Sequence, residues 1–347
     1  MGKILKVKRI YGFLALLFCL LPSTMMCQDI HFSQFWLAPV NINPATAGFF
    51  EGDARLMAYN RTQWRAISKA YQTVGISADL PLVKRPSKQD IFGLGVTLDY
   101  DQAGDSKYKT MQSNLMLSYA RALNYRNNNF LMGGLFFGGA QRSWSYNDLI
   151  FDEQFQNGIF NPDLPNTETY YGNNFWFADM GLGIQWYYQP DFLEYYQVGF
   201  SVSHLNRPKI TMMKDDNIRL PVKFTAHASV SIAVHSSIAI LPSAYISFQK
   251  KYREFLFGTT YSHSLPIDVM GYINKTNIGL YYRWNDAVYF SAGMDWRRFK
   301  FSISYDFNVS QLSVASQARG GVEIIVSYII KKKRYIKRKT IPCAVFN

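Results

Sequence analysis

The chain has 347 residues, of which 18% are charged and 16% are aromatic. These are few charges and many aromatic residues for a soluble domain. The mean hydropathy of −0.12 is too low for a bundle of membrane-spanning helices. A transmembrane β-barrel accounts for both values, because only one side of each strand faces lipid and aromatic girdles line both interfaces.

The net charge of +13 does not describe a basic surface. Four positive charges lie in residues 1–27 and seven in residues 331–339, and neither segment contains an acidic residue. The remainder of the chain is therefore close to neutral. A nucleic-acid-binding surface spread over a domain is not supported.

Residues 1–27 have the organisation of a secretion signal. Four basic residues precede an apolar run at 10–21, which is too short to span a membrane as a helix. We predict cleavage after Cys27, so that Gln28 begins the mature chain. The alternative is a lipoprotein acylated at Cys27, but Thr24-Met25-Met26 is a poor lipobox.

Residues 28–52 combine aromatic side chains with Asn41, Asn43, Pro44 and Gly48. Proline and asparagine disfavour a spanning strand. We interpret this segment, called the leader below, as a compact periplasmic element packed against or into the mouth of a barrel.

From residue 53 onward, apolar and polar residues alternate in segments of about ten. A period of two identifies β-strands, and this length lets a tilted strand cross a bilayer core. The clearest case is the hairpin at 288–307. We predict an all-β fold, a transmembrane antiparallel up-and-down barrel of about fourteen strands over residues 53–330. The predicted strands are 53–64, 70–80, 91–101, 110–121, 130–143, 175–188, 194–204, 222–235, 238–249, 253–261, 273–284, 287–296, 299–307 and 320–330.

The connections between these strands indicate the orientation. The long connections 144–174, 205–221 and 308–319 all follow odd-numbered strands of the prediction. Bacterial barrels have long outer loops and short periplasmic turns. We therefore expect an outer-membrane protein of a Gram-negative cell with both termini in the periplasm.

The polar side of the strands faces the lumen and carries charges of both signs. Mixed charges tend to pair and brace the wall, whereas a selective ion channel tends to show a ring of one sign. A passive or substrate-specific channel is the alternative function, and it requires an open lumen. The predicted lumen-facing charged residues are Arg55, Arg61, Asp99, Asp179, Lys275, Arg283, Asp295, Lys300, Asp306 and Glu323.

Nothing in the sequence indicates catalysis. Ser203 and His204 are adjacent, so one strand would place them on opposite faces, where they cannot act as nucleophile and base. Asp215-Asp216-Asn217 offers oxygen atoms that suit calcium, but such residues are also common in turns. We predict no catalytic residue, no cofactor and no metal site.

Two regions are candidates for binding partners. The connection 144–174 is dense in aromatic residues, which suits a protein-binding surface; alternatively, it folds inward and plugs the barrel. The basic tail 331–347 suits anionic lipid or an acidic periplasmic partner; alternatively, it is a solvated anchor. The partner-binding candidates are Trp144, Tyr146, Phe151, Phe155, Phe160, Tyr170, Tyr171, Lys331, Lys332, Lys333 and Arg334.

Short motifs recur in order along the mature chain: QDIHFSQF at 28–35, NPATAG at 43–48, YNRTQW at 59–64, GFSVSHLN at 199–206, YRWNDA at 282–287, SYD at 304–306 and GGVEI at 320–324. Together they resemble the PorP/SprF family of type IX secretion membrane proteins of Bacteroidetes, although Asn60 interrupts the family's Tyr-Arg-x-Gln-Trp pattern. The residues that carry the resemblance are Asn43, Pro44, Ala45, Gly48, Arg61, Trp64, His204, Arg283, Asn285, Asp286, Asp306 and Glu323.

The resemblance implies a non-enzymatic outer-membrane barrel that supports secretion or surface attachment of large adhesins and, in some members, gliding motility. The partners it implies are an adhesin with a type B C-terminal domain and type IX components, either the periplasmic ring or a peptidoglycan-linked lipoprotein. Outer-membrane lipid is also expected, and nucleic acid is not.

Overall fold

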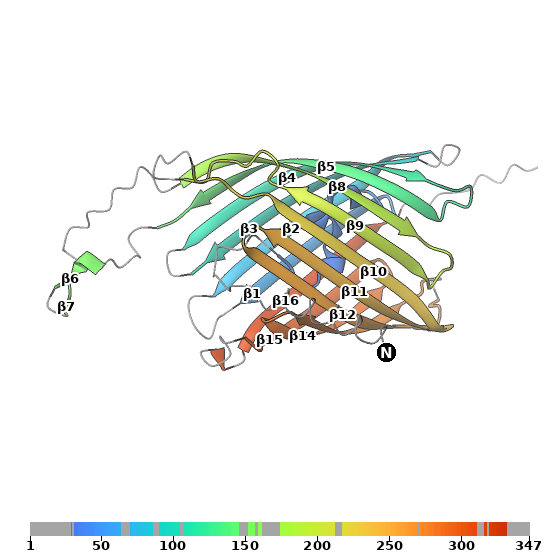
Figure 1. The fold of residues 1–347 in the computed structure, drawn as a ribbon. Helices are drawn as coiled ribbons and strands as arrows, with labels where there is room; N and C mark the ends of the chain where they lie inside the picture. The colour runs from blue at the N-terminus through green and yellow to red at the C-terminus, as the bar shows by residue number, and fades with distance from the viewer. Residues whose placement is uncertain are drawn as a thin grey trace, which may run out of the picture.

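The computed structural model is a closed antiparallel barrel of fourteen strands (Figure 1). It describes residue 29 and residues 31–63, 70–85, 90–104, 107–145, 152–156, 159–161, 174–211, 217–269, 271–310, 316–317 and 319–331. The predicted signal peptide and the tail beyond Lys331 lie outside the described residues.

The barrel strands follow one another around the wall in chain order. Each predicted strand coincides with one observed strand, and the differences are at the ends. The barrel strands are β1 (Ala54–Gln63), β2 (Tyr71–Arg85), β3 (Asp90–Ala103), β4 (Tyr108–Ala122), β5 (Asn129–Ser143), β8 (Asn174–Tyr188), β9 (Tyr195–Ser203), β10 (Lys223–His235), β11 (Ile238–Gln249), β12 (Tyr252–Ser264), β13 (Lys275–Arg283), β14 (Ala287–Trp296), β15 (Phe299–Asn308) and β16 (Arg319–Ile330).

The barrel closes where its first and last strands meet. β1 pairs with β16 from Ala54 opposite Ile330 to Gln63 opposite Gly321. Full pairing at this seam leaves no open sheet edge, as a wall surrounded by lipid requires. No helix within the described part of the chain is long and apolar enough to cross a membrane.

Between β5 and β8, the described residues form a small separate unit. It consists of the 3-10 turn η3 (Asp152–Gln154) and the strands β6 (Phe155–Gln156) and β7 (Ile159–Phe160), which pair with each other. In the described residues, this long connection therefore contributes its own short sheet and no strand of the barrel.

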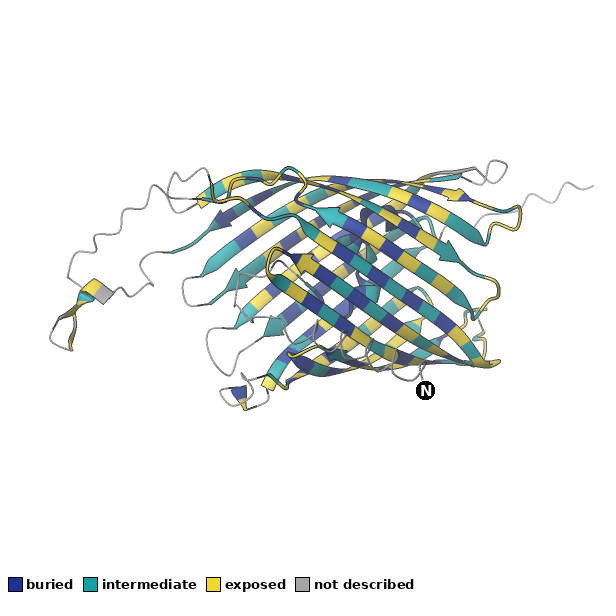
Figure 2. Ribbon diagram, viewed as in Figure 1, coloured by how far each residue is buried: buried dark blue, intermediate teal, exposed yellow. Residues whose placement is uncertain are grey.

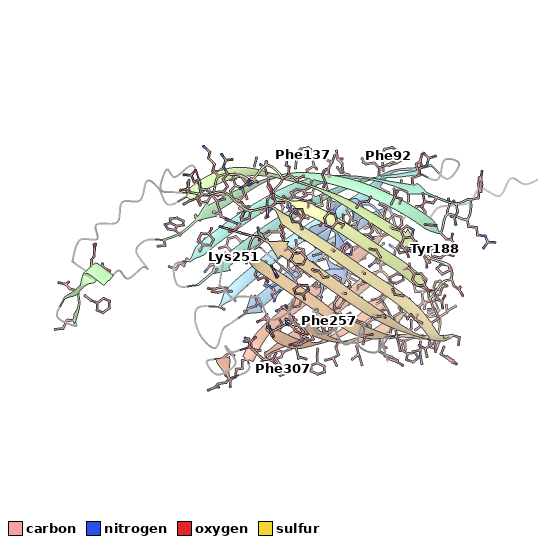
Figure 3. The ribbon with its side chains drawn as sticks, viewed as in Figure 1. Phe92, Phe137, Tyr188, Lys251, Phe257 and Phe307 are labelled. Atoms are coloured by element: carbon pink, nitrogen blue, oxygen red, sulfur yellow. The ribbon has the colours of Figure 1, made fainter. Side chains whose placement is uncertain are left out.

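The two faces of the wall differ as the alternation predicts. Buried and exposed residues alternate along each strand (Figure 2). Large apolar side chains point outward, including Phe92, Phe137 and Phe257 (Figure 3). Phe290 and Ile303 are 52% and 50% exposed, which suits a surface that lipid covers.

The leader lies inside the ring of strands, where Figure 1 shows its short helices in blue. These are η1 (Phe35–Leu37), α2 (Pro39–Ile42) and η2 (Pro44–Thr46). Pro39 and Pro44 occupy first helical positions, where a missing N–H costs nothing. The Asn43 side chain caps η2 by accepting the N–H of Ala45 at 3.0 Å.

The leader runs through the barrel lengthwise. Asp29 contacts Lys223 at the end where β9 finishes and β10 begins, whereas the N–H of Asp53 donates to Ile330 O at the other end. The expected position at the barrel mouth is thus corrected: the segment occupies the lumen. Asp29 and Lys331 lie at opposite ends of the barrel, which the expectation of two periplasmic termini did not anticipate.

Candidate functional site

The first anchor of the leader is at the closing seam. Arg61 on β1 and Glu323 on β16 lie opposite each other across this seam. The Glu323 carboxylate accepts the backbone N–H groups of Ser33 at 2.8 Å and Gln34 at 2.9 Å. The Arg61 guanidinium donates to His31 O at 2.7 Å. The leader is therefore bonded to both strands that close the barrel.

Two further strands, β15 and β13, extend this anchor. The Ser33 hydroxyl donates to Asp306 on β15 at 3.1 Å and accepts from Arg283 on β13 at 2.6 Å. Arg283 also approaches Asp306 at 3.3 Å and Glu254 at 3.3 Å. All these charges are buried. A buried charge is tolerated when it is paired and hydrogen-bonded, and here the leader's backbone supplies part of that compensation.

The second anchor centres on His204, which follows β9 with a positive φ of 60°. Its Nδ1 lies 2.9 Å from Asp179, and its Nε2 lies 3.0 Å from Asp29 of the leader. Lys223 approaches the same Asp29 carboxylate at 3.5 Å. A leader carboxylate is thus held between two cationic side chains of the wall.

The buried surroundings and neighbouring charges set the protonation states of His204 and Asp29 at this second anchor. Burial alone would lower the pKa of His204, but the carboxylates of Asp29 and Asp179 outweigh it and raise that pKa to about 9. Burial would raise the pKa of Asp29, but Lys223 and His204 hold it well below its usual range. His204 is therefore protonated and Asp29 ionised at neutral pH.

His31 behaves in the opposite way to His204. Burial and then the cationic Arg61 and Arg283 hold the pKa of His31 well below its usual range. It is therefore neutral at neutral pH, and its ring Nδ1 lies 3.3 Å from Asp29 O.

Further along the leader, the NPATAG segment presses its backbone against the wall. The Asn43 amide donates to Ile184 O at 3.0 Å. A Cβ at Gly134 would overlap the backbone of Ala45, and one at Gly93 would overlap the Ala47 carbonyl. The wall needs glycine at these inward positions because another stretch of backbone lies against it.

The turn that ends this segment is also fixed to the wall. Gly48 has a φ of +70°, which favours glycine. Its N–H donates to Asp79 on β2 at 2.8 Å, and two nitrogens of Arg55 reach the same carboxylate, each at 2.8 Å. The backbone N–H of Gly48 and the guanidinium of Arg55 therefore both bind the Asp79 carboxylate.

Aromatic rings pack the leader against the wall along its length. Trp36 stacks on Tyr281 with ring centroids 4.3 Å apart, and Phe32 meets Tyr59 edge-on at 4.5 Å. Near the other end, Phe49 packs edge-on against Phe130 at 5.1 Å. Aromatic pairs of this geometry stabilise beyond their burial alone.

A polar cavity of about 70 Å³ remains beside the leader, with space for a few water molecules. Its charged and amide lining is Asp29, Asn41, Asp99, Gln112, Asn114, Asp179, His204 and Lys223. Among the described residues, no group of three or more His, Cys, Asp or Glu side chains could hold a metal ion. Asp215 and Asp216 lie outside that range.

The structure brings most of the family-motif residues into one interface. Asn43, Pro44, Ala45 and Gly48 are the leader side of it. Of the others, Asp286 pairs with Arg283 at 2.9 Å, Asn285 occupies a positive-φ turn, and Trp64 lies outside the described residues. The wall residues of the motif that touch the leader are Arg61, His204, Arg283, Asp306 and Glu323.

Sequence reasoning missed this interface. It treated the lumen charges as pairing among themselves, and it did not use the glycines that interrupt the strands. Gly93, Gly134 and Gly183 are all inward and all abut the leader. A glycine inside a strand often marks close approach of another backbone, and this signal was available.

The predicted partner-binding residues lie elsewhere. Trp144 stacks on Tyr108 with centroids 6.2 Å apart, Phe155 is 49% exposed, and Phe160 ends β7. Exposed Lys331 pairs with Glu51 of the leader at 3.2 Å. The remaining candidates, which lie outside the described residues, are Tyr146, Phe151, Tyr170, Tyr171, Lys332, Lys333 and Arg334.

A closed barrel with an apolar outer face and a polar interior is an outer-membrane β-barrel. The family model for the type IX secretion system membrane protein PorP/SprF matches residues 25–328. The chain therefore belongs to this family, as the ordered motifs predicted. The family and the fold are those of a secretion-related membrane barrel and not of enzymes.

Solved structures of similar fold include two toluene transporters. The Ralstonia pickettii toluene transporter TbuX has 8% identity and a TM-score of 0.49, covering 84% of this chain and 92% of its own. The Pseudomonas putida toluene transporter TodX has 9% identity and a TM-score of 0.48, with coverages of 84% and 92%. No curated protein matches the chain.

Proposed function

We propose that this protein is a non-enzymatic outer-membrane component of the type IX secretion system, plugged by its own leader, that acts through protein contacts. It supports secretion or surface attachment of large adhesins in a Bacteroidetes cell and, in that role, gliding motility. Membership in the PorP/SprF family supports the secretion role. The observation that carries the mechanism is the leader inside the lumen.

The position of the leader argues against the channel alternative. Solutes would have to pass a segment bonded to Glu323 and Asp306 at one anchor and to His204 at the other. Releasing it would leave buried carboxylates and arginines without partners, and each such loss is costly. The barrel is therefore a rigid scaffold whose partners bind at its ends.

The two ends suit different partners. The connections 144–174 and 205–221, on the outside in this proposal, would hold the adhesin and its type B C-terminal domain. Phe155 offers an exposed aromatic side chain there. At the periplasmic end, the basic tail that begins at Lys331 would meet the periplasmic ring or a peptidoglycan-linked lipoprotein. The predicted signal peptide delivers the chain to this membrane.

The test is a deletion strain examined for surface adhesin. Loss of the gene should abolish display of the adhesin, and full-length protein supplied from a plasmid should restore it. Normal display in the deletion strain would contradict the secretion role. Separately, purified full-length protein in a planar bilayer should give no steady conductance, and a large stable conductance would contradict the plugged scaffold.

A further inference from the structure

The loop that joins β12 to β13 is long for its side of the barrel. It covers residues 265–274 and lies at the end where Lys331 follows β16. The turns on either side of it at this end are only 236–237 and 297–298. Bacterial barrels keep the turns on their periplasmic side short, so the length of this loop needs a reason beyond joining two strands.

Hydrogen bonds fix the described part of the β12–β13 loop. The Asp268 carboxylate accepts the Tyr272 N–H at 2.9 Å and the Arg297 Nε–H at 2.9 Å. Gly271, with a φ of +80°, donates its N–H to Asp268 O at 2.9 Å. The Arg298 guanidinium donates to the Tyr272 hydroxyl at 3.2 Å. The loop is therefore held against the β14–β15 turn, and a partner that binds it does not have to order it first.

Two large apolar side chains lie exposed on this loop. Ile267 is 67% exposed and Val269 is 98% exposed. They flank Asp268, whose carboxylate fixes the loop, so the same hydrogen bonds hold both side chains at the surface. Covering apolar surface that water now contacts is favourable, and the fixed loop lowers the entropy that binding would cost.

The loop lies beyond the part of the wall that faces lipid. Trp296 and Phe299 point outward on either side of the β14–β15 turn, 42% and 40% exposed, and aromatic residues of this kind mark the edge of the hydrocarbon region. Arg297 and Arg298 lie between them and bind the loop. Arginine at this level extends to the head groups or to water. In the proposed orientation, the two apolar side chains therefore face the periplasm.

The basic tail begins beside the loop. The N–H of Ile329 donates to Arg298 O at 2.9 Å, so the end of β16 adjoins the turn that holds the loop. Residues 331–347 include seven basic residues and no acidic one. An apolar tip and the start of a basic segment are thus neighbours at this end of the barrel, and one partner can contact both.

We propose that Ile267 and Val269 enter an apolar pocket of a periplasmic type IX component whose surrounding surface carries carboxylates for the basic tail. This inference rests on the proposed function and adds to the tail a second contact with the same partner. Apolar side chains need a pocket that excludes water, and lysine and arginine need carboxylates. The chemistry of the two neighbouring elements together therefore defines the partner's binding face.

The first test places a photo-crosslinking amino acid at position 269 of the full-length protein in its own cells. Irradiation should join the barrel to a periplasmic type IX component, identified by mass spectrometry. The control position is Tyr125, which is 97% exposed at the same end but lies between β4 and β5, on another side of the barrel. Cross-links only to phospholipid, to the chain's own tail or to a second copy would overturn the inference, and so would no cross-link at all.

Substitutions then measure how much the tip contributes. I267S with V269S should weaken binding of the cross-linked component about 100-fold, because burying each aliphatic side chain is worth about tenfold. The measurement is recovery of that component with the barrel over a dilution series of membrane extract. I267V with V269I should retain most of the binding, because the apolar surface is kept. The matched control is L123S with Y125S, which removes two exposed apolar side chains at the same end and should bind like wild type.

Folding and display are scored separately from binding. The urea midpoint should stay unchanged in all these variants, because exposed side chains contribute little to stability. Equal binding by wild type and the variant carrying I267S and V269S would overturn the inference. If deletion of the gene abolishes adhesin display while that variant keeps its periplasmic partner, this inference ends and the proposed function stands. Normal display in the deletion strain ends the proposed function instead.

Discussion

The two anchors of the leader are both ionic, but only one of them contains a cation that loses its charge at mildly alkaline pH. At the seam, Glu323 and Asp306 meet guanidinium groups and backbone N–H donors, and arginine stays charged throughout. At the other anchor, the cation facing Asp29 and Asp179 is a histidine. The comparison indicates a permanent attachment beside the barrel closure and a conditional one beside β9, at the same end of the barrel.

Removing Glu323 should have the largest effect. Glu323→Ala leaves the Ser33 and Gln34 N–H groups without acceptors and leaves Arg61 undercompensated, so it should destabilise the folded barrel by about 3–5 kcal/mol. Urea unfolding in detergent measures this. Asp295→Ala is the control, because its partner Lys300 is exposed and that pair is worth at most ~1 kcal/mol. Equal losses of stability in the two variants would show that the bonds to Glu323 contribute no more than the exposed Asp295–Lys300 pair.

The second prediction concerns His204 and pH. Its pKa is raised from 6.5 to about 9 in the folded protein, so its contribution is complete below about pH 6.5 and is lost as pH rises through about 9. The depressed pKa of Asp29 gives a contribution that is present above about pH 4 and is lost on acidification. The stabilisation by this anchor should therefore be greatest between about pH 4 and pH 7.

The measurement compares wild type with His204→Gln in urea at pH 6, 7, 8, 9 and 10. The stability gap between them should be on the order of 2 kcal/mol at pH 6 and shrink toward zero at pH 10. His235→Gln, at the exposed end of β10, should show no such trend. A gap that is constant across this range would mean that the His204 charge does not hold the leader.

How much the sequence could predict also differs between the wall and the leader. Strand positions are local: alternation over residues such as Phe299, Phe301 and Ile303 needs no knowledge of the rest of the chain. The bond from Ser33 to Glu323 joins residues 290 positions apart, and no short pattern specifies such a contact. The sequence therefore offered the motif residues only as separate short patterns, and the contacts that many of them make between leader and wall became visible only in the closed barrel.

The third prediction tests whether the middle of the leader depends on close packing. Gly134→Val places a branched side chain against the backbone of Pro44 and Ala45, and such overpacking costs about 1–3 kcal/mol. The leader should loosen and become sensitive to protease, with intermittent conductance in a bilayer. Gly133→Val is the matched control, because a Cβ there meets nothing within 4 Å. Identical behaviour of the two variants would refute this contact.

The smallest effect on stability is expected at the end of the leader that meets the tail. Lys331 and Glu51 are both exposed, so their ion pair should contribute less than ~1 kcal/mol. Replacing the seven basic residues of 331–339 with serine should leave the urea midpoint unchanged while weakening co-purification with periplasmic type IX components. If co-purification is unchanged, the tail is not the periplasmic contact. If stability falls as far as in Glu323→Ala, the permanent attachment extends along the whole leader, and the contrast between its two anchors is too simple.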